Sequence, residues 1–396
     1  MSDKVIVAGV GMIPFRKPGQ SAPYDVMGAD AARAALKDAA IDYDDMQQAY
    51  AGYVYGDSCS GQAALYHLGI NGVPIVNVNN NCASGSTAFA LAAQAVGSGA
   101  ADCALALGFE EMAPGAVGMT FPEKTDPLAR HNDAVAGVMG LSPEEQEAPP
   151  AIRFFGCQVD LLREEYGIGD EIEARVAVKA RRHAANNPNA IFRAPLTVEE
   201  VLAQPPIFRG LRKLYACPPS CGAAAVVVCR EAFARRRGVS GGVALVGHGF
   251  LSDKSEYFAG DRLDVMFRAL SRDAARQAYE RSGLGPGDLD VIELHDCFTS
   301  NEIATYSALG LCDDGDLGRF VMEDENTYGG RVVVNPSGGL LSKGHPLGAT
   351  GLAQITELVT QLRRTAGARQ VEHARTALQH NGGLGSAAFV HIFQPA

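Results

Sequence analysis

The sequence predicts an α/β protein made of two similar halves, with a further segment inserted in the first half. Short β-branched runs alternate with alanine-rich helical stretches along the chain, which is typical of helices that cross over a largely parallel sheet. The order strand, turn, small-residue helix, strand occurs twice. With 396 residues the chain also exceeds one ordinary hydrophobic core.

The first copy of this pattern surrounds residue 82. Ile75–Val78 is predicted to be a buried strand, and small apolar residues recur at helical spacing after Cys82. A second strand is expected at residues 103–107. This half is assigned residues 1–115 together with residues 216–242.

The second copy lies in residues 243–396. Residues 332–334 are expected to form a strand, followed by a glycine-rich turn and a helix with Leu352, Ile355 and Val359 on one face. Another strand is predicted at residues 376–378.

Residues 116–215 are predicted to form the inserted loop domain, because proline and charged residues interrupt the pattern there. One helix is expected, at residues 171–185. The segment also carries a basic cluster in an otherwise acidic chain, and most of these side chains are expected to be solvated. Contacts with a phosphate-bearing substrate are assigned to Arg209, Arg212, Lys213 and, from the second half, Ser337.

The overall charge and the cysteines limit the partners and the compartment. A net charge of −11 argues against general binding to nucleic acid or to a membrane surface, since both are anionic. Nine cysteines without framework spacing, and no secretion signal at the start, indicate a reducing cytoplasm. We therefore expect a soluble cytoplasmic protein.

Cys82 has the sequence setting of a nucleophile. It follows a predicted strand and precedes a helix of small residues, where free amide groups and the helix dipole favour a thiolate. Its own backbone amide could help to hold an oxyanion. The alternative is a buried structural thiol, the commoner state of free cysteine.

A histidine occupies the corresponding turn of the second half, at residues 335–351. If the halves are related by approximate two-fold symmetry, the two turns approach each other. His345 could then act as a general base for Cys82.

Three reactive side chains end the buried run at residues 291–294, where ligands of α/β sheets bind. His295 could donate to a developing oxyanion, and Cys297 could move a proton at the substrate α-carbon. Asp296 is expected to cap the helix that follows.

The remaining candidates do not predict a metal or a redox cofactor. Residues 379–386 are interpreted as a glycine-rich turn between two strands, where backbone amides can approach a ligand. A strand rather than a helix follows, so no nicotinamide cofactor is implied. Cys217 and Cys221 have no second cysteine pair, which argues against a zinc site.

Together these four loops, around Cys82, residues 295–298, residues 344–346 and residues 380–385, resemble those of the thiolases in order and spacing. The similarity is greatest to the sterol carrier protein X-type, or lipid-transfer-protein-type, branch, and it covers nearly the whole chain. It implies a five-layered α-β-α-β-α fold, with two duplicated halves and an inserted loop domain. It also implies a homodimer or homotetramer.

The resemblance further implies roles for the site residues. Cys82 would carry an acyl group and His345 would activate it. His295 and His345 would polarise the thioester oxygen, and Cys297 would be the acid/base. Coenzyme A and acyl-CoA would be substrates, with no cofactor.

One departure separates this chain from the best-known thiolases. Their last loop supplies the acid/base cysteine as Cys-x-Gly, but Gln379 and Asn381 stand at those positions here. Cys297 is the natural replacement. The backbone amide of Asn381 is expected to complete an oxyanion hole with that of Cys82.

Three other functions remain open at this stage. A decarboxylating ketosynthase also uses one cysteine in a related fold. A thiolase-like aldolase of sterol side-chain breakdown would work with a small OB-fold partner. A binding scaffold for acyl-CoA or lipid would keep the fold without turnover.

Overall fold

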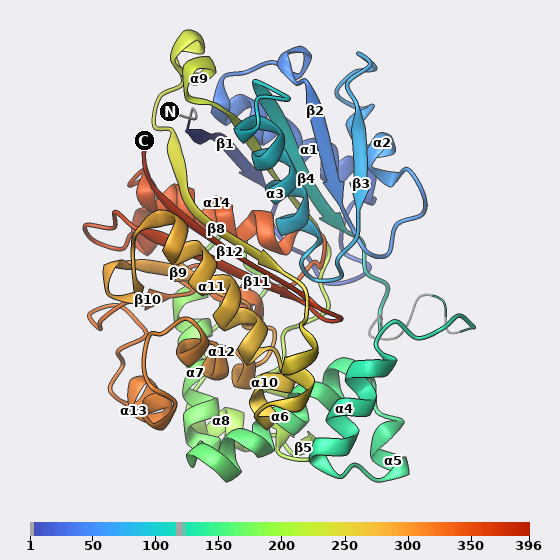
Figure 1. The fold of residues 1–396 in the computed structure, drawn as a ribbon, viewed down its shortest axis with the longest axis vertical. Coiled ribbons are helices and arrows are strands. Elements are labelled where there is room, and N and C mark those ends of the chain that lie inside the picture. The colour runs from blue at the N-terminus through green and yellow to red at the C-terminus, as the bar shows by residue number, and fades with distance from the viewer. Residues whose placement is uncertain (1–3, 116–120, 122) are drawn as a thin grey trace.

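The computed structural model describes residues 4–115, 121 and 123–396 (Figure 1). The first half contributes an alternating series of strands and helices, closed by a short helix. These are β1 (Val5–Met12), α1 (Tyr24–Ala39), β2 (Gln48–Gly52), α2 (Ser60–Leu65), β3 (Ile75–Val78), α3 (Ser84–Gly97), β4 (Cys103–Glu110), β7 (Gly222–Arg230) and α9 (Glu231–Arg237).

The second half repeats this series, with small additional helices. Its elements are β8 (Val243–Leu251), α10 (Arg262–Val265), α11 (Arg268–Ser282), β9 (Val291–Glu293), α12 (Thr299–Ala308), α13 (Leu317–Met322), β10 (Val333–Val334), α14 (Thr350–Leu362), β11 (Ala377–Gly383) and β12 (Ala387–Pro395).

The two halves have the same strand order. The ten-stranded sheet runs β10-β9-β11-β12-β8-β1-β7-β4-β2-β3. When the five strands of each half are numbered in chain order, their order from the outer edge of the sheet to its middle is third, second, fourth, fifth, first in both halves. The halves join where β1 pairs with β8 through Ile6↔Ala244 and Val7↔Val243. The predicted duplication is confirmed.

Helices α3 and α14 contact each other and form the middle layer of the molecule (Figure 1). Buried alanine, leucine and valine side chains of both helices pack against strands from both halves in one core. On the outer faces α1 packs on β1 and β7, and α11 packs on β8 and β12. This arrangement is the five-layered fold expected from the sequence.

Residues 111–221 separate β4 from β7, whereas residues 384–386 alone separate the equivalent strands β11 and β12. The helix predicted at residues 171–185 is α7. Helix α6 was not predicted, although it buries Phe154, Phe155 and Leu161. The domain boundaries proposed from the sequence stay a prediction. The segment contains α4 (Ala129–Met139), α5 (Pro143–Gln146), α6 (Pro150–Tyr166), α7 (Asp170–Ala184), α8 (Val198–Leu202), β5 (Pro206–Phe208) and β6 (Leu211–Arg212).

Two details of the sequence interpretation were wrong. β3 lies at the edge of the sheet rather than inside it, and Val76 is 44% exposed. Residues 379–383 belong to β11, so the turn is confined to residues 384–386. Across the described residues, none of the helices combines the length and apolarity that a membrane crossing requires.

Candidate active site

The four predicted loops converge on a cavity of about 660 Å³. Cys82, His295, Cys297 and His345 all line it. Residues 216–219 form part of its wall, because Ala216 bridges to Phe298 and Pro219 bridges to His345. The structure therefore brings together the four residues to which the sequence assigned the chemistry.

Local hydrogen bonds shape the loop that presents Cys82. The amide of Asn81 donates to Asn79 Oδ1 (3.0 Å), and Asn81 adopts a left-handed φ of 51°, which asparagine tolerates better than most residues. Ser84 Oγ accepts from the amide of Asn80 (3.0 Å) and donates to the Asn81 carbonyl (2.7 Å). Cys82 is thereby held just before the first turn of α3.

The thiol of Cys82 is protonated at neutral pH, contrary to the sequence-based expectation of a thiolate. Burial raises its pKa to about 12, although hydrogen bonds from the backbone amides of Leu384 and Cys82 favour the charged form. Desolvation by the surrounding loops outweighs the helix terminus. A nucleophilic role for Cys82 therefore requires a nearby base.

The turn that carries His345 requires glycine at position 344. Gly344 has a φ of 120°, and a Cβ there would meet Ile191 and Ser220 side-chain atoms within 3.0 Å. The amide of His345 donates to Ser220 Oγ (3.0 Å). The two loops also meet backbone to backbone, since a Cβ on Gly85 would lie 2.5 Å from the Gly348 carbonyl oxygen.

Thr350 fixes the tautomer of His345. The Thr350 hydroxyl donates its proton to the Pro346 carbonyl (2.8 Å), so at 2.7 Å it can only accept from His345 Nδ1. Nδ1 therefore carries the ring proton and Nε2 carries a lone pair. Among the described residues, His345 Nε2 has no hydrogen-bond partner.

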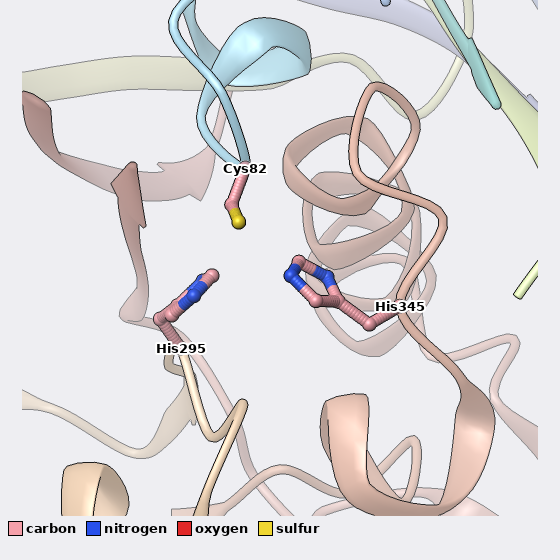
Figure 2. Close-up of side chains that lie close together, drawn as sticks. All are labelled: Cys82, His295 and His345. Atoms are coloured by element: carbon pink, nitrogen blue, oxygen red, sulfur yellow. The ribbon is translucent and has the colours of Figure 1, made fainter. Parts of the chain in front are cut away.

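Burial lowers the pKa of His345 to about 3, so the ring is neutral and Nε2 keeps its lone pair. One nitrogen each of His295 and His345 and Cys82 Sγ all lie within 4.8 Å of one another, and Figure 2 shows both rings turned toward Cys82. The two rings pack edge to face, with centroids 5.1 Å apart. This geometry allows proton transfer from Cys82 to His345.

His295 is held by Asn381, whose side-chain amide lies 2.9 Å from His295 Nδ1. Its pKa lies well below the ordinary value because of burial and the neighbouring His345 and His380. Asn301 Nδ2 also donates to the His295 carbonyl (2.5 Å). The ring is thus a neutral, rigidly placed hydrogen-bonding group.

Asp296 does not cap the following helix, so that prediction was wrong. Its carboxylate accepts from the amides of Leu340 (2.8 Å) and Leu341 (3.4 Å), in the turn that leads to His345. Helix α12 begins after Phe298 without a side-chain cap. Asp296 therefore ties the His295 loop to the His345 loop.

Cys297 is a protonated thiol facing the cavity. Burial raises its pKa well above the ordinary value, and the neighbouring Cys217 and Cys82 add to the effect. The amide of Cys217 donates to the Cys297 carbonyl (2.9 Å), and Cys217 also lines the cavity. From the sequence, Cys217 was considered only as a zinc ligand, because its neighbours along the chain gave no sign of this partner.

Glu110 is a second buried group that the sequence did not reveal. It ends β4 and accepts from the amides of Tyr55 (3.0 Å), Val54 (3.1 Å) and Gly348 (3.0 Å). Burial raises its pKa to about 7, although these three hydrogen bonds oppose the rise. Its position at the carboxyl end of an apolar strand was the available signal.

The basic residues predicted to contact the substrate do not line the cavity. Arg209 pairs with Glu145 (2.8 Å), and Arg212 pairs with Asp170 (2.7 Å). Carboxylates within the inserted segment thus neutralise both guanidinium groups. Lys213 is exposed and also lies outside the cavity lining.

The cavity does have a basic residue, Lys124, which the sequence did not single out. Its ammonium group lies 3.9 Å from the centre of the Phe121 ring.

Two other predicted contacts also lie outside the cavity lining. Ser337 is fully buried and donates to Glu293 (2.8 Å). Asn381 is buried behind His295, while Gly382 rather than Asn381 lines the cavity.

Fold and site together define the class of protein. The chain belongs to the thiolase family: a family model for the thiolase N-terminal domain matches residues 5–232, and one described as thiolase C-terminal domain-like matches residues 253–395. This confirms the resemblance seen in the sequence.

Individual relatives place the chain more closely. Sterol carrier protein 2 of Oryctolagus cuniculus is 47% identical over 99% of this chain and 72% of that protein. The benzoylsuccinyl-CoA thiolase subunit BbsB of Thauera aromatica is 36% identical over 97% of this chain and 96% of that protein. A solved Ltp2-ChsH2(DUF35) aldolase shares the fold, with a TM-score of 0.82 at 23% identity over 99% of this chain and 98% of that one.

Proposed function

We propose that this protein is an acyl-CoA C-acyltransferase, a thiolase that cleaves 3-ketoacyl-CoA with coenzyme A or catalyses the reverse condensation through an acyl-Cys82 intermediate. The observation that carries the proposal is the pairing of a protonated Cys82 thiol with the bare Nε2 of a neutral His345. A nucleophile with an adjacent base is the arrangement that covalent acyl transfer needs.

The cycle begins when Cys82 Sγ attacks the 3-keto carbon and His345 Nε2 takes the thiol proton. The bond between the α- and β-carbons then breaks, and its electron pair leaves with acetyl-CoA as an enolate. The Cys297 thiol supplies the proton that this enolate requires at carbon. Free coenzyme A finally attacks the acyl-Cys82 thioester and gives its thiol proton to the Cys297 thiolate. The C–S bond to Cys82 breaks, the Cys82 sulfur takes back the proton held by His345, and the shortened acyl-CoA is released.

The cavity favours an acyl group larger than acetyl. Its volume of about 660 Å³ lies in the range of pockets that enclose whole small molecules. Phe155, Phe267 and Phe298 supply apolar lining to this cavity. A homodimer or homotetramer in the cytoplasm, without a cofactor, is part of the same proposal.

A second candidate is a thiolase-like aldolase that acts with a small partner protein. The fold shared with the Ltp2-ChsH2(DUF35) aldolase favours it. Such an enzyme would not need a nucleophilic cysteine. A scaffold that binds acyl-CoA or lipid without turnover is the third, and neither of these explains a base beside Cys82.

The test is to mix the protein with coenzyme A and 3-ketoacyl-CoA substrates of several chain lengths and to follow thioesters by mass spectrometry. A chain-shortened thioester and an acyl adduct on Cys82 are expected. Both should disappear in Cys82→Ala and persist in the control Cys312→Ala, which alters a partly buried cysteine outside the cavity lining. Absence of turnover and adduct at every chain length would contradict the proposal and favour the aldolase or the scaffold.

A further inference from the structure

A chain of hydrogen bonds behind His295 begins at a backbone carbonyl, whose role as an acceptor is fixed. Gln354, on α14, donates from Nε2 to the His380 carbonyl (3.1 Å). Its other amide atom, Oε1, therefore faces Gln379 and accepts from Gln379 Nε2 (2.9 Å). The orientation of the first amide thus sets that of the second.

The orientation of the Gln379 amide in turn determines how Ser86 is hydrogen-bonded. Gln379 Nε2 also donates to Ser86 Oγ (2.8 Å), while Gln379 Oε1 accepts from His391 Nδ1 (2.6 Å). Ser86 Oγ has one proton, and it donates that proton to Asn381 Oδ1 (2.8 Å). The oxygen of the Asn381 amide consequently faces Ser86, on α3.

The nitrogen of the Asn381 amide must then face His295. Asn381 Nδ2 lies 2.9 Å from His295 Nδ1 and has only protons to offer. His295 Nδ1 is therefore the acceptor, and the ring proton resides on Nε2. Gln354, Gln379, Ser86 and Asn381 are all fully buried, so water does not compete for these bonds.

We propose that Gln354, Gln379, Ser86 and Asn381 form a tautomer relay, a set of positioning residues that fixes His295 as a hydrogen-bond donor through Nε2. The inference rests on the proposed function, because a donor at this site matters when a thioester oxygen becomes negatively charged. It also assigns a task to Gln379 and Asn381, the two residues at which this chain departs from the Cys-x-Gly pattern.

The relay makes the two active-site imidazoles complementary. His345 is held by Thr350 with its proton on Nδ1 and its lone pair toward Cys82. His295 is held in the opposite state, with a proton available on Nε2. One ring accepts and the other donates, so both can act on the same bound thioester. The opposite tautomer of His295 would present a lone pair to the developing oxyanion and repel it.

The direct test uses the wild-type protein with ¹⁵N-labelled histidine. Nitrogen chemical shifts distinguish a protonated ring nitrogen from a bare one, and substitution of individual histidines assigns the signals. We expect a bare Nδ1 and a protonated Nε2 for His295, and the reverse for His345. A protonated Nδ1 on His295 would overturn the proposal.

Ser86→Ala tests whether the relay causes this state. Without the hydroxyl, Asn381 loses the donor that holds its oxygen and is free to turn, so His295 should populate both tautomers. Turnover should fall roughly tenfold to a hundredfold, less than about 10²–10³-fold for complete loss of an oxyanion donor. An unchanged His295 spectrum in Ser86→Ala would show that the relay does not set the tautomer.

Ser300→Ala is the matched control. Ser300 is also a fully buried helical serine, but its hydroxyl bonds to the Phe155 carbonyl (3.3 Å). It should leave the His295 spectrum unchanged. The spectra also separate this proposal from the proposed function: the expected tautomers without any turnover would overturn the thiolase and uphold the relay, and turnover with a protonated Nδ1 would do the opposite.

Discussion

The loop of Cys82 and the loop of His345 occupy equivalent places in the two halves, yet they are held in different ways. Asn79, Asn81 and Ser84 hold the first loop mainly through bonds within the loop, with one bond from Asn81 Nδ2 to the Leu384 carbonyl of the other half (3.1 Å), and the loop is partly exposed beside an edge strand. The second is buried and is held by carboxylates from elsewhere in the chain, Asp296 and Glu110.

The comparison shows how equivalent turns of a duplicated scaffold can be held differently. Cys82 lies in the partly exposed loop, and His345 lies in a turn that is fixed from several directions. In the proposed reaction, this would keep the ring of His345 oriented during proton transfer from Cys82. Three changes test this contrast, beginning with the one of largest expected effect. A fourth change tests the basic residues of the inserted segment.

His345→Asn should reduce turnover about 10³-fold, since general-base catalysis typically contributes 10²–10⁴-fold. Alkylation of Cys82 by iodoacetamide should slow as well, because no base accepts the thiol proton when the sulfur reacts. His183→Asn is the control: His183 is buried outside the cavity lining and bonds to the Asn335 carbonyl (2.9 Å). Equal losses in both variants would mean that His345 acts only structurally.

Glu110 should make stability depend on pH. Its pKa is about 7 in the folded protein against 4.5 ordinarily, so its stabilising contribution is complete below pH 4.5 and is lost as the pH rises through 7. The free energy of unfolding, measured with urea, should fall by about 2–3 kcal/mol more in the wild type than in Glu110→Gln when the pH rises from 5 to 8. A difference that stays constant with pH would contradict this assignment.

Thr350→Val should lower turnover about tenfold, because the buried Nδ1–H of His345 loses its acceptor and a missing buried hydrogen bond costs about 1–3 kcal/mol. Thr356→Val is matched to it, since both threonines lie on α14 and donate to the carbonyl four residues earlier. Steady-state kinetics should show the loss in Thr350→Val alone.

Arg212→Ala should have the smallest effect, a change of less than about twofold in KM for coenzyme A, since its charge is already paired with Asp170 (2.7 Å). Lys124→Ala, which alters the cavity's own cation, should raise this KM more. A larger increase for Arg212→Ala would restore the sequence-based assignment of a phosphate contact.

The sequence predicted several of the strands, the duplicated halves and the convergence of Cys82 with His345, because apolar periodicity and repeated element order are local signals. It could not predict the protonation state of Cys82. That state depends on burial by loops from distant parts of the chain, including Leu384.

Distant pairing also explains the other omissions. Glu110 and Gly348 are 238 residues apart in the sequence, and the residues around them do not predict that they meet. Arg209 and Arg212 suggested a phosphate site because the carboxylates that neutralise them come together only in the folded segment. Charge patterning along a chain does not reveal such pairs.

The glycine contact between the two loops has a consequence for how the sequence of this protein can diverge. Gly85 and Gly348 touch through the main chain, so the spacing of Cys82 and His345 depends on the absence of a side chain at both positions, and any larger residue there would push the two loops apart. Phe155 and Phe298 line the cavity without such a restriction. Substitutions in the cavity wall can therefore change the shape of the cavity while Cys82 and His345 keep their spacing.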